Sequence, residues 1–111
     1  MTFEREDWGR LAENIVYIEL RRRGKEIFYF KNEKEVDFIL TELGKPYLAI
    51  QFAYSNLEDP KTKDREIFAL IECLNELKLK KGIILTRSFE HRDTIQDKQI
   101  EFIPLYKWLR G

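Results

Sequence analysis

The fold is decided by two apolar runs, residues 35–40 (EVDFIL) and residues 47–53 (YLAIQFA), which are separated by a turn at residues 44–46 (GKP). Alternating side chains in each run predict two neighbouring β-strands. One carboxylate, Asp37, and one amide, Gln51, stand among the large apolar residues of these strands. Because a carboxylate is costly to bury unless another group pairs with it, the surroundings of Asp37 are the first clue to function.

A further strand and a helix are predicted on the N-terminal side of this pair. Residues 26–30 (EIFYF) are rich in aromatic side chains, which favour a strand, and a polar turn follows at residues 31–34. The short turns predict three consecutive antiparallel strands. Helical spacing of apolar residues predicts a helix over residues 8–23, which Gly24 ends.

The C-terminal half continues with a helix and two more strands. We expect the strand over residues 82–86 to run parallel to a neighbour because it follows a helix. The other predicted segments are a polar loop (55–63), a helix (64–77), a polar loop holding a helical turn (87–99), a strand (100–104) and a terminal helical turn (105–109). The predicted fold class is α/β, a mixed β-sheet flanked by helices in a single domain over residues 1–111.

Composition and charge limit the classes of function. The chain has 111 residues, of which 43% are hydrophobic, enough for one domain with a modest core. Lys and Arg total 20 and Asp and Glu total 20, so nucleic-acid binding needs a local basic patch. The chain has a single cysteine, no signal peptide and no apolar run near the ~20 residues that span a membrane. These features predict a soluble cytoplasmic protein, or a soluble piece of a larger one.

Three oxygen-bearing side chains form the candidate site. Glu13 borders the apolar face of the first predicted helix, which we expect to cover the strands carrying Asp37 and Gln51. Carboxylate and amide oxygens are ligands that Mg²⁺ prefers, and such an ion stabilises the charge that builds on a phosphate during hydrolysis. Two alternatives stay open: Asp37 is a strand-end aspartate that accepts backbone hydrogen bonds, and Glu13 is an edge charge that reaches solvent.

The order helix, three strands, helix, strand, with Asp37 on the second strand and Gln51 on the third, resembles the PD-(D/E)XK nuclease superfamily. The resemblance implies a restriction-endonuclease-like core (α-β-β-β-α-β), here with an extra strand and a C-terminal helical turn. It also implies a Mg²⁺-dependent DNA endonuclease, a hydrolase in which Glu13, Asp37 and Gln51 form the catalytic and metal-binding site.

Several short pieces resemble, more narrowly, the C-terminal nuclease-like domain of archaeal and bacterial AAA-type ATPases. They are residues 9–14 (GRLAEN), 19–24 (ELRRRG), 34–38 (KEVDF), 50–51 (IQ), 65–67 (REI), 69–70 (AL) and 103–109 (IPLYKWL). Their order and spacing together carry the resemblance. It implies that an ATPase domain or protein is a partner, in cis or in trans.

One position departs from the superfamily motif Glu/Gln-x-Lys. Two residues after Gln51 the chain has Ala53, where the motif lysine normally positions water and neutralises charge near the scissile phosphate. The resemblance therefore implies degenerate or weak catalysis unless another cation takes that place. The candidate cations, which are also the predicted nucleic-acid-binding residues, are Lys31, Lys34 and Arg65.

Two function hypotheses follow. The first is a nuclease-like domain that associates with nucleic acid, works with an ATPase and uses Mg²⁺ if it is active. The second is a non-catalytic structural or protein-interaction domain of an ATPase, in which Asp37 and Gln51 are hydrogen-bonded core residues. Apolar sheet edges and Trp108 leave room for a homodimer under either hypothesis.

Overall fold

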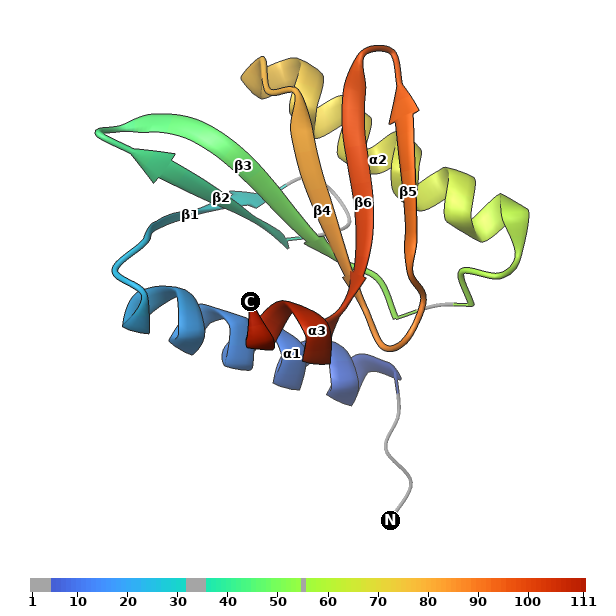
Figure 1. Ribbon diagram of the computed structural model, residues 1–111, viewed down its shortest axis with the longest axis horizontal. Helices are drawn as coiled ribbons and strands as arrows, with labels where there is room; N and C mark the ends of the chain where they lie inside the picture. Colours follow the sequence, from blue (N-terminus) through green and yellow to red (C-terminus); the bar gives the residue numbers. More distant parts are fainter. Residues whose placement is uncertain (1–4, 32–35, 55) are drawn as a thin grey trace.

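The computed structural model describes residues 5–31, 36–54 and 56–111, and gives only the backbone for residues 5–7, 30, 31, 36 and 37 (Figure 1). This part of the chain has three helices, which are α1 (Arg5–Arg22), α2 (Pro60–Leu77) and α3 (Leu105–Arg110). Its strands are β1 (Glu26–Lys31), β2 (Val36–Glu42), β3 (Lys45–Phe52), β4 (Lys81–Thr86), β5 (His91–Ile95) and β6 (Lys98–Pro104).

The strands form one mixed sheet within the described ranges, in the order β1-β2-β3-β4-β6-β5. β1, β2 and β3 pair antiparallel, which confirms the three predicted consecutive strands. β4 pairs in parallel with β3 and with β6, and β5 returns antiparallel to β6. The chain passes from β3 to β4 through α2, the kind of long crossover that neighbouring parallel strands require. The predicted α/β class is therefore confirmed.

The helices cover opposite faces of the sheet, with α1 and α3 on one face and α2 on the other (Figure 1). Alternation along β3 divides its buried side chains between the two faces. Ile50 and Phe52 pack in the α1 core with Ala12, Val16 and Leu20, whereas Ala49 packs in the α2 core with Ile67, Leu70 and Leu74. Burial on both faces explains the nearly continuous apolar sequence of β3 and β4.

β5 corrects the prediction that residues 87–99 form a polar loop with a helical turn. It forms a hairpin with β6 through a turn at Gln96 and Asp97, whose φ angles are 54° and 64°. Two consecutive positive φ angles are typical of the tight turn that matches the twist of a hairpin. The sheet thus has two strands after β4: β6 confirms the extra strand predicted over residues 100–104, and β5 is a further strand that the sequence did not predict.

α2 begins at Pro60, four residues before the predicted start. Proline is favoured in the first turn of a helix because its φ is already helical and its missing N–H would have had no helical partner. The helix ends at Leu77, after which Lys78 turns into the left-handed region with φ 58°. α3 confirms the predicted terminal helical turn. Across the described residues, no helix combines the length and apolar character needed to span a membrane.

Candidate functional site

Gln51 lies near the end of β3 and directs its side chain toward α2. The side chain is 1% exposed. Its Nε2 donates to Oε2 of Glu66 at 2.7 Å and to the backbone carbonyl of Glu66 at 3.3 Å. The predicted site residue is therefore a buried link between the sheet and α2.

Glu66 is a buried carboxylic acid that the sequence analysis did not select. It is 6% exposed, and burial raises its pKa above the ordinary value, while the hydrogen bond from Gln51 and the charge of Arg65 act in the opposite direction. A carboxyl group with a raised pKa beside a buried amide is the type of group that clusters at functional sites. A signal was present in the sequence, because Glu66 stands four residues before Leu70 and so lies on the apolar stripe of α2.

Glu13 occupies the opposite side of the sheet from the Gln51–Glu66 pair. It belongs to α1, and it lines a shallow hollow with Gly9, Arg10 and Tyr54. Partial burial raises the pKa of Glu13 above its ordinary value. The contacts of the described side chains therefore do not bring Glu13 and Gln51 together.

Asp37 is described only by its backbone, so its side chain lies outside the described residues. The backbone belongs to β2 and stands opposite Phe30 of β1. Phe38 pairs with Ile50 in the β2–β3 register, so Asp37 comes directly before one member of that pair and Gln51 directly after the other. The backbone is thus arranged as the sequence predicts, and the role of Asp37 stays a prediction.

The predicted Mg²⁺ site is not assembled by the described side chains. Within the described ranges, no three His, Cys, Asp or Glu side chains lie close enough together to hold a metal ion. Gln51 is hydrogen-bonded to Glu66, and Glu13 lies on the other side of the sheet. Because the side chain of Asp37 lies outside the described residues, metal binding by Glu13, Asp37 and Gln51 stays a prediction.

The structure describes the side chains of Ala53 and of one of the three candidate cations. Ala53 is 2% exposed, packs in the α2 core, and donates its backbone N–H to the carbonyl of Leu85 at 3.0 Å. Arg65 is exposed on α2, next to Glu66. The side chain of Lys31 and the whole of Lys34 lie outside the described residues. Arg65, the candidate cation with a described side chain, has no contact that places it at the position of the motif lysine.

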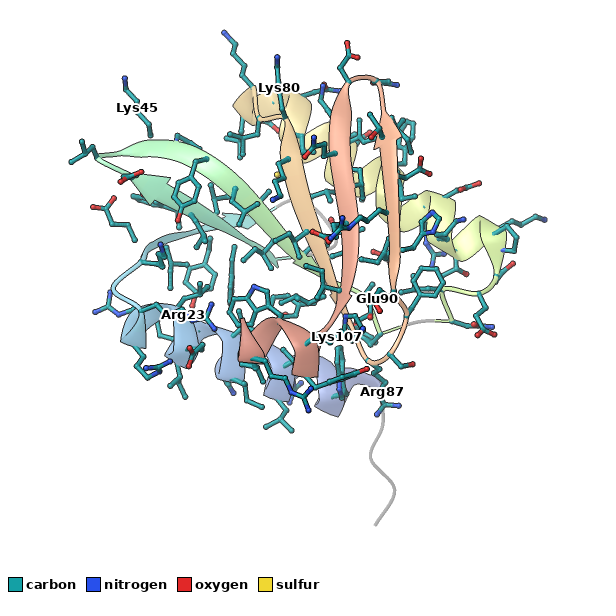
Figure 2. All side chains as sticks on the ribbon, in the orientation of Figure 1. Arg23, Lys45, Lys80, Arg87, Glu90 and Lys107 are labelled. Atoms are coloured by element: carbon teal, nitrogen blue, oxygen red, sulfur yellow. The ribbon has the colours of Figure 1, made fainter. Side chains whose placement is uncertain are left out.

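A hollow of about 450 Å³ opens where the parallel strands β3 and β4 end. Its walls are Ala53, Tyr54, Asn56, Leu57 and Glu58 from the chain after β3, and Thr86, Arg87, Ser88, Phe89 and Glu90 from the end of β4 and the loop that follows. Figure 2 shows Arg87, Glu90 and Lys107 at this end of the sheet, with Lys45 and Lys80 at the opposite end. The hollow therefore brings together side chains that are about 30 residues apart in the sequence.

Sequence comparisons identify the class of protein to which this α/β domain belongs. Residues 8–108 match the model of a family described as "Domain of unknown function (DUF4143)", and the chain belongs to that family. It is similar to "Uncharacterized protein MJ1544" of Methanocaldococcus jannaschii, with 38% identity over 111 residues. The alignment covers 90% of this chain and 24% of that relative, so the chain spans about a quarter of the relative's length. No solved structure matches the chain.

Proposed function

We propose that this domain is a degenerate PD-(D/E)XK-like nuclease domain that associates with nucleic acid without cleaving it and works with an ATPase. The observation that carries the proposal is the position and hydrogen bonding of Gln51. It lies on the third strand of an α-β-β-β-α-β order, directly beyond the residue that pairs with Phe38, yet its amide is hydrogen-bonded to Glu66. An order of elements that resembles the nuclease core is thus combined with an amide held inside the core.

The lack of a motif lysine argues against hydrolysis. Ala53 offers no charge to position water or to stabilise a phosphorane-like transition state. Mg²⁺ chemistry would need Asp37 together with at least one further oxygen donor, and the described donors are divided between the two faces of the sheet. We therefore propose binding, rather than cleavage, as the retained property of the domain.

Association with an ATPase is supported by family membership and by the length of the relative. The family is typically found together with AAA-type ATPases, in line with the resemblance of the short sequence pieces. The relative is about four times as long as the aligned segment, which leaves room for an ATPase domain in that protein. The ATPase partner, in cis or in trans, is part of the same proposal.

Cleavage and binding assays on the same protein test the proposal. Plasmid and single-stranded DNA and RNA are incubated with Mg²⁺ or Mn²⁺, with Asp37→Ala as the comparison, and binding is measured in the presence of EDTA. We expect no cleavage and salt-sensitive binding, because phosphate contacts release counterions. Metal-dependent cleavage that Asp37→Ala abolishes would show an active nuclease, and absent binding would remove the nucleic-acid part of the proposal.

A protein-interaction domain is the second candidate, and the exposed apolar side chains favour it. Leu11 and Ile18 are seven residues apart on the outer side of α1 and are 47% and 65% exposed. Phe28 and Tyr29, on the edge strand β1, are 57% and 55% exposed. Phe28 and Tyr29 are neighbours in a strand and so face opposite sides of the sheet, which leaves Leu11 and Ile18 of α1 as the apolar pair on a single surface that suits a protein contact. Sedimentation of the wild type and of Ile18→Glu tests the protein-interaction function. A wild-type dimer that the substitution dissociates would support it.

A further inference from the structure

We propose that the hollow at the ends of β3 and β4 binds one nucleotide of a single-stranded nucleic acid, with Arg87 on the phosphate and Tyr54 against the base. The inference rests on the proposed nucleic-acid association and names the site that carries it. The carboxyl ends of parallel strands are the usual place for ligands in open α/β sheets, since the loops that follow the strands are free to shape a site. The hollow lies at that position.

The walls of the hollow are held by local hydrogen bonds. Ala53 is a small residue of the wall where β3 ends, and it is otherwise buried in the α2 core. The loop after β4 is held in place because Thr86 Oγ1 donates to the carbonyl of Phe89 at 2.6 Å. On the other side of the hollow, the backbone N–H of Glu58 donates to Oδ1 of Asn56 at 3.1 Å. Both walls are therefore shaped before any ligand binds.

Arg87 supplies the positive charge of the hollow. Its guanidinium lies over the ring of Trp8, 5.7 Å from the ring centroid, and among the described residues it has no carboxylate partner. Stacking on Trp8 restrains the planar group while leaving its N–H donors available, which suits the two-pronged recognition of a phosphate. Arg87 is thus a cation from the loop after the neighbouring strand β4, at the hollow that Ala53 lines.

Tyr54 supplies an exposed aromatic face beside that charge. Its ring is 38% exposed, lies 6.3 Å from the ring of Trp8, and forms a wall of both this hollow and the smaller one at Glu13. Bases stack on such faces only when they are unpaired, which favours a single strand over a duplex. The net charge of +0 also disfavours a broad contact with the duplex backbone.

The hollow also has two acidic residues, Glu58 and Glu90. Glu90 accepts a hydrogen bond from Nζ of Lys107 at 2.6 Å, which neutralises its charge, and the pairing raises the pKa of Lys107 (Figure 2). Glu58 is exposed, and with Asn56 and Ser88 it offers polar atoms to the edge of a base. Because Glu58 offsets the charge of Arg87, the hollow has no net positive charge, and recognition of a single nucleotide unit rests on the guanidinium of Arg87 and the aromatic face of Tyr54.

Fluorescence anisotropy with a labelled oligothymidylate and a matched duplex tests the site. The variants are Arg87→Ala, Arg87→Lys and Tyr54→Leu, and the control is Arg21→Ala, an exposed arginine about 20 Å further along α1 from Trp8. We expect Arg87→Ala to weaken single-strand binding about tenfold and to lower the slope of log K against log salt by about 0.7, since one phosphate contact is lost. Arg87→Lys should recover only part of the affinity.

The outcomes separate this inference from the function on which it rests. If the wild type binds and Arg87→Ala resembles Arg21→Ala, the site is wrong and the nucleic-acid association stands. If the wild type binds no oligonucleotide, both proposals fail. Duplex binding as tight as single-strand binding would overturn base stacking on Tyr54. Melting curves show whether Tyr54→Leu is folded, and the Arg87 variants decide the question if it is not.

Discussion

The amide nitrogen of Gln51 lies 2.7 Å from Oε2 of Glu66, and this hydrogen bond joins the centre of the sheet to α2. The carbonyl oxygen of Gln51 has no hydrogen-bond partner in the described part of the chain. Burial removes water from the Glu66 carboxylate, and one hydrogen bond from a neutral amide does not replace that hydration. Burial therefore raises the pKa of Glu66. A neutral side chain at position 66 should therefore fit this buried site better than a charged carboxylate.

We expect Glu66→Gln to raise the melting temperature near neutral pH. The substitution removes the buried charge, and the new NH₂ group can donate to the unpartnered Oε1 of Gln51. Satisfying a buried acceptor corresponds to a gain on the order of 1 kcal/mol in the free energy of unfolding. Glu72→Gln, an exposed position on the same helix, is the matched control and should leave the melting temperature nearly unchanged.

The advantage of Glu66→Gln should depend on pH with a definite sign. The pKa of Glu66 is raised in the folded protein, so its stabilising contribution is complete below the ordinary value of 4.5 and is lost as pH rises through the folded-state pKa. The difference in stability between variant and wild type should therefore grow with pH above about 4.5. Denaturant titrations across this range measure it, and a difference that shrinks with pH would contradict the assignment.

We expect Gly82→Ala to destabilise the protein by about 1–3 kcal/mol, because a Cβ at this position overpacks the core. It would lie 2.7 Å from Cδ2 of Leu70, and the Leu70 side chain is fully buried in the α2 core. Urea denaturation measures the change. Gly111→Ala is the control, since its Cβ would meet only backbone oxygens at 3.9 Å. Combining Gly82→Ala with Leu70→Ala should cost less than the sum of the two changes, and strict additivity would show that they do not touch.

The strands around Asp37 and Gln51 could be predicted because their signals are local. Period-two alternation and short turns specify β2 and β3, and a helix before residues 82–86 predicts a parallel partner. β5 has no such signal, because an edge strand is exposed and its residues His91 to Ile95 are mostly polar. What identifies that strand is its pairing with β6, which is a tertiary contact.

The site was less predictable because its residues depend on which helix covers which face. Alternation alone places Gln51 on the face opposite Ile50, but nothing local says that α2 rather than α1 covers that face. The prediction grouped Gln51 with Glu13, whereas the described contacts pair it with Glu66. Arg87 was equally hidden, since its place beside Ala53 follows from the parallel pairing of β3 and β4.

Arg23→Ala should loosen α3 and alter the fluorescence of Trp108. The guanidinium of Arg23 lies 4.9 Å from the centroid of the Trp108 ring and donates to the carbonyl of Leu109 at 3.4 Å, so it ties the turn after α1 to α3. Loss of a cation–π contact of this kind corresponds to about 0.5–1 kcal/mol. Arg22→Ala is the control, because Arg22 shares the partner Glu19 but does not contact Trp108. Equal emission changes in both variants would rule out the contact.

Glu19 should titrate far below an ordinary glutamate. Hydrogen bonds from Arg22 and Arg23, at 2.6 to 2.9 Å, hold its pKa at about 2 in the folded protein. Its stabilising contribution is therefore present above the ordinary value of 4.5 and is lost as pH falls through about 2. NMR titration of the Glu19 carboxyl carbon measures the pKa, which should rise toward 4.5 in the Arg22→Ala, Arg23→Ala double variant. Arg21→Ala is the matched control, and a Glu19 titration that is the same in all three proteins would show that the two arginines do not set it.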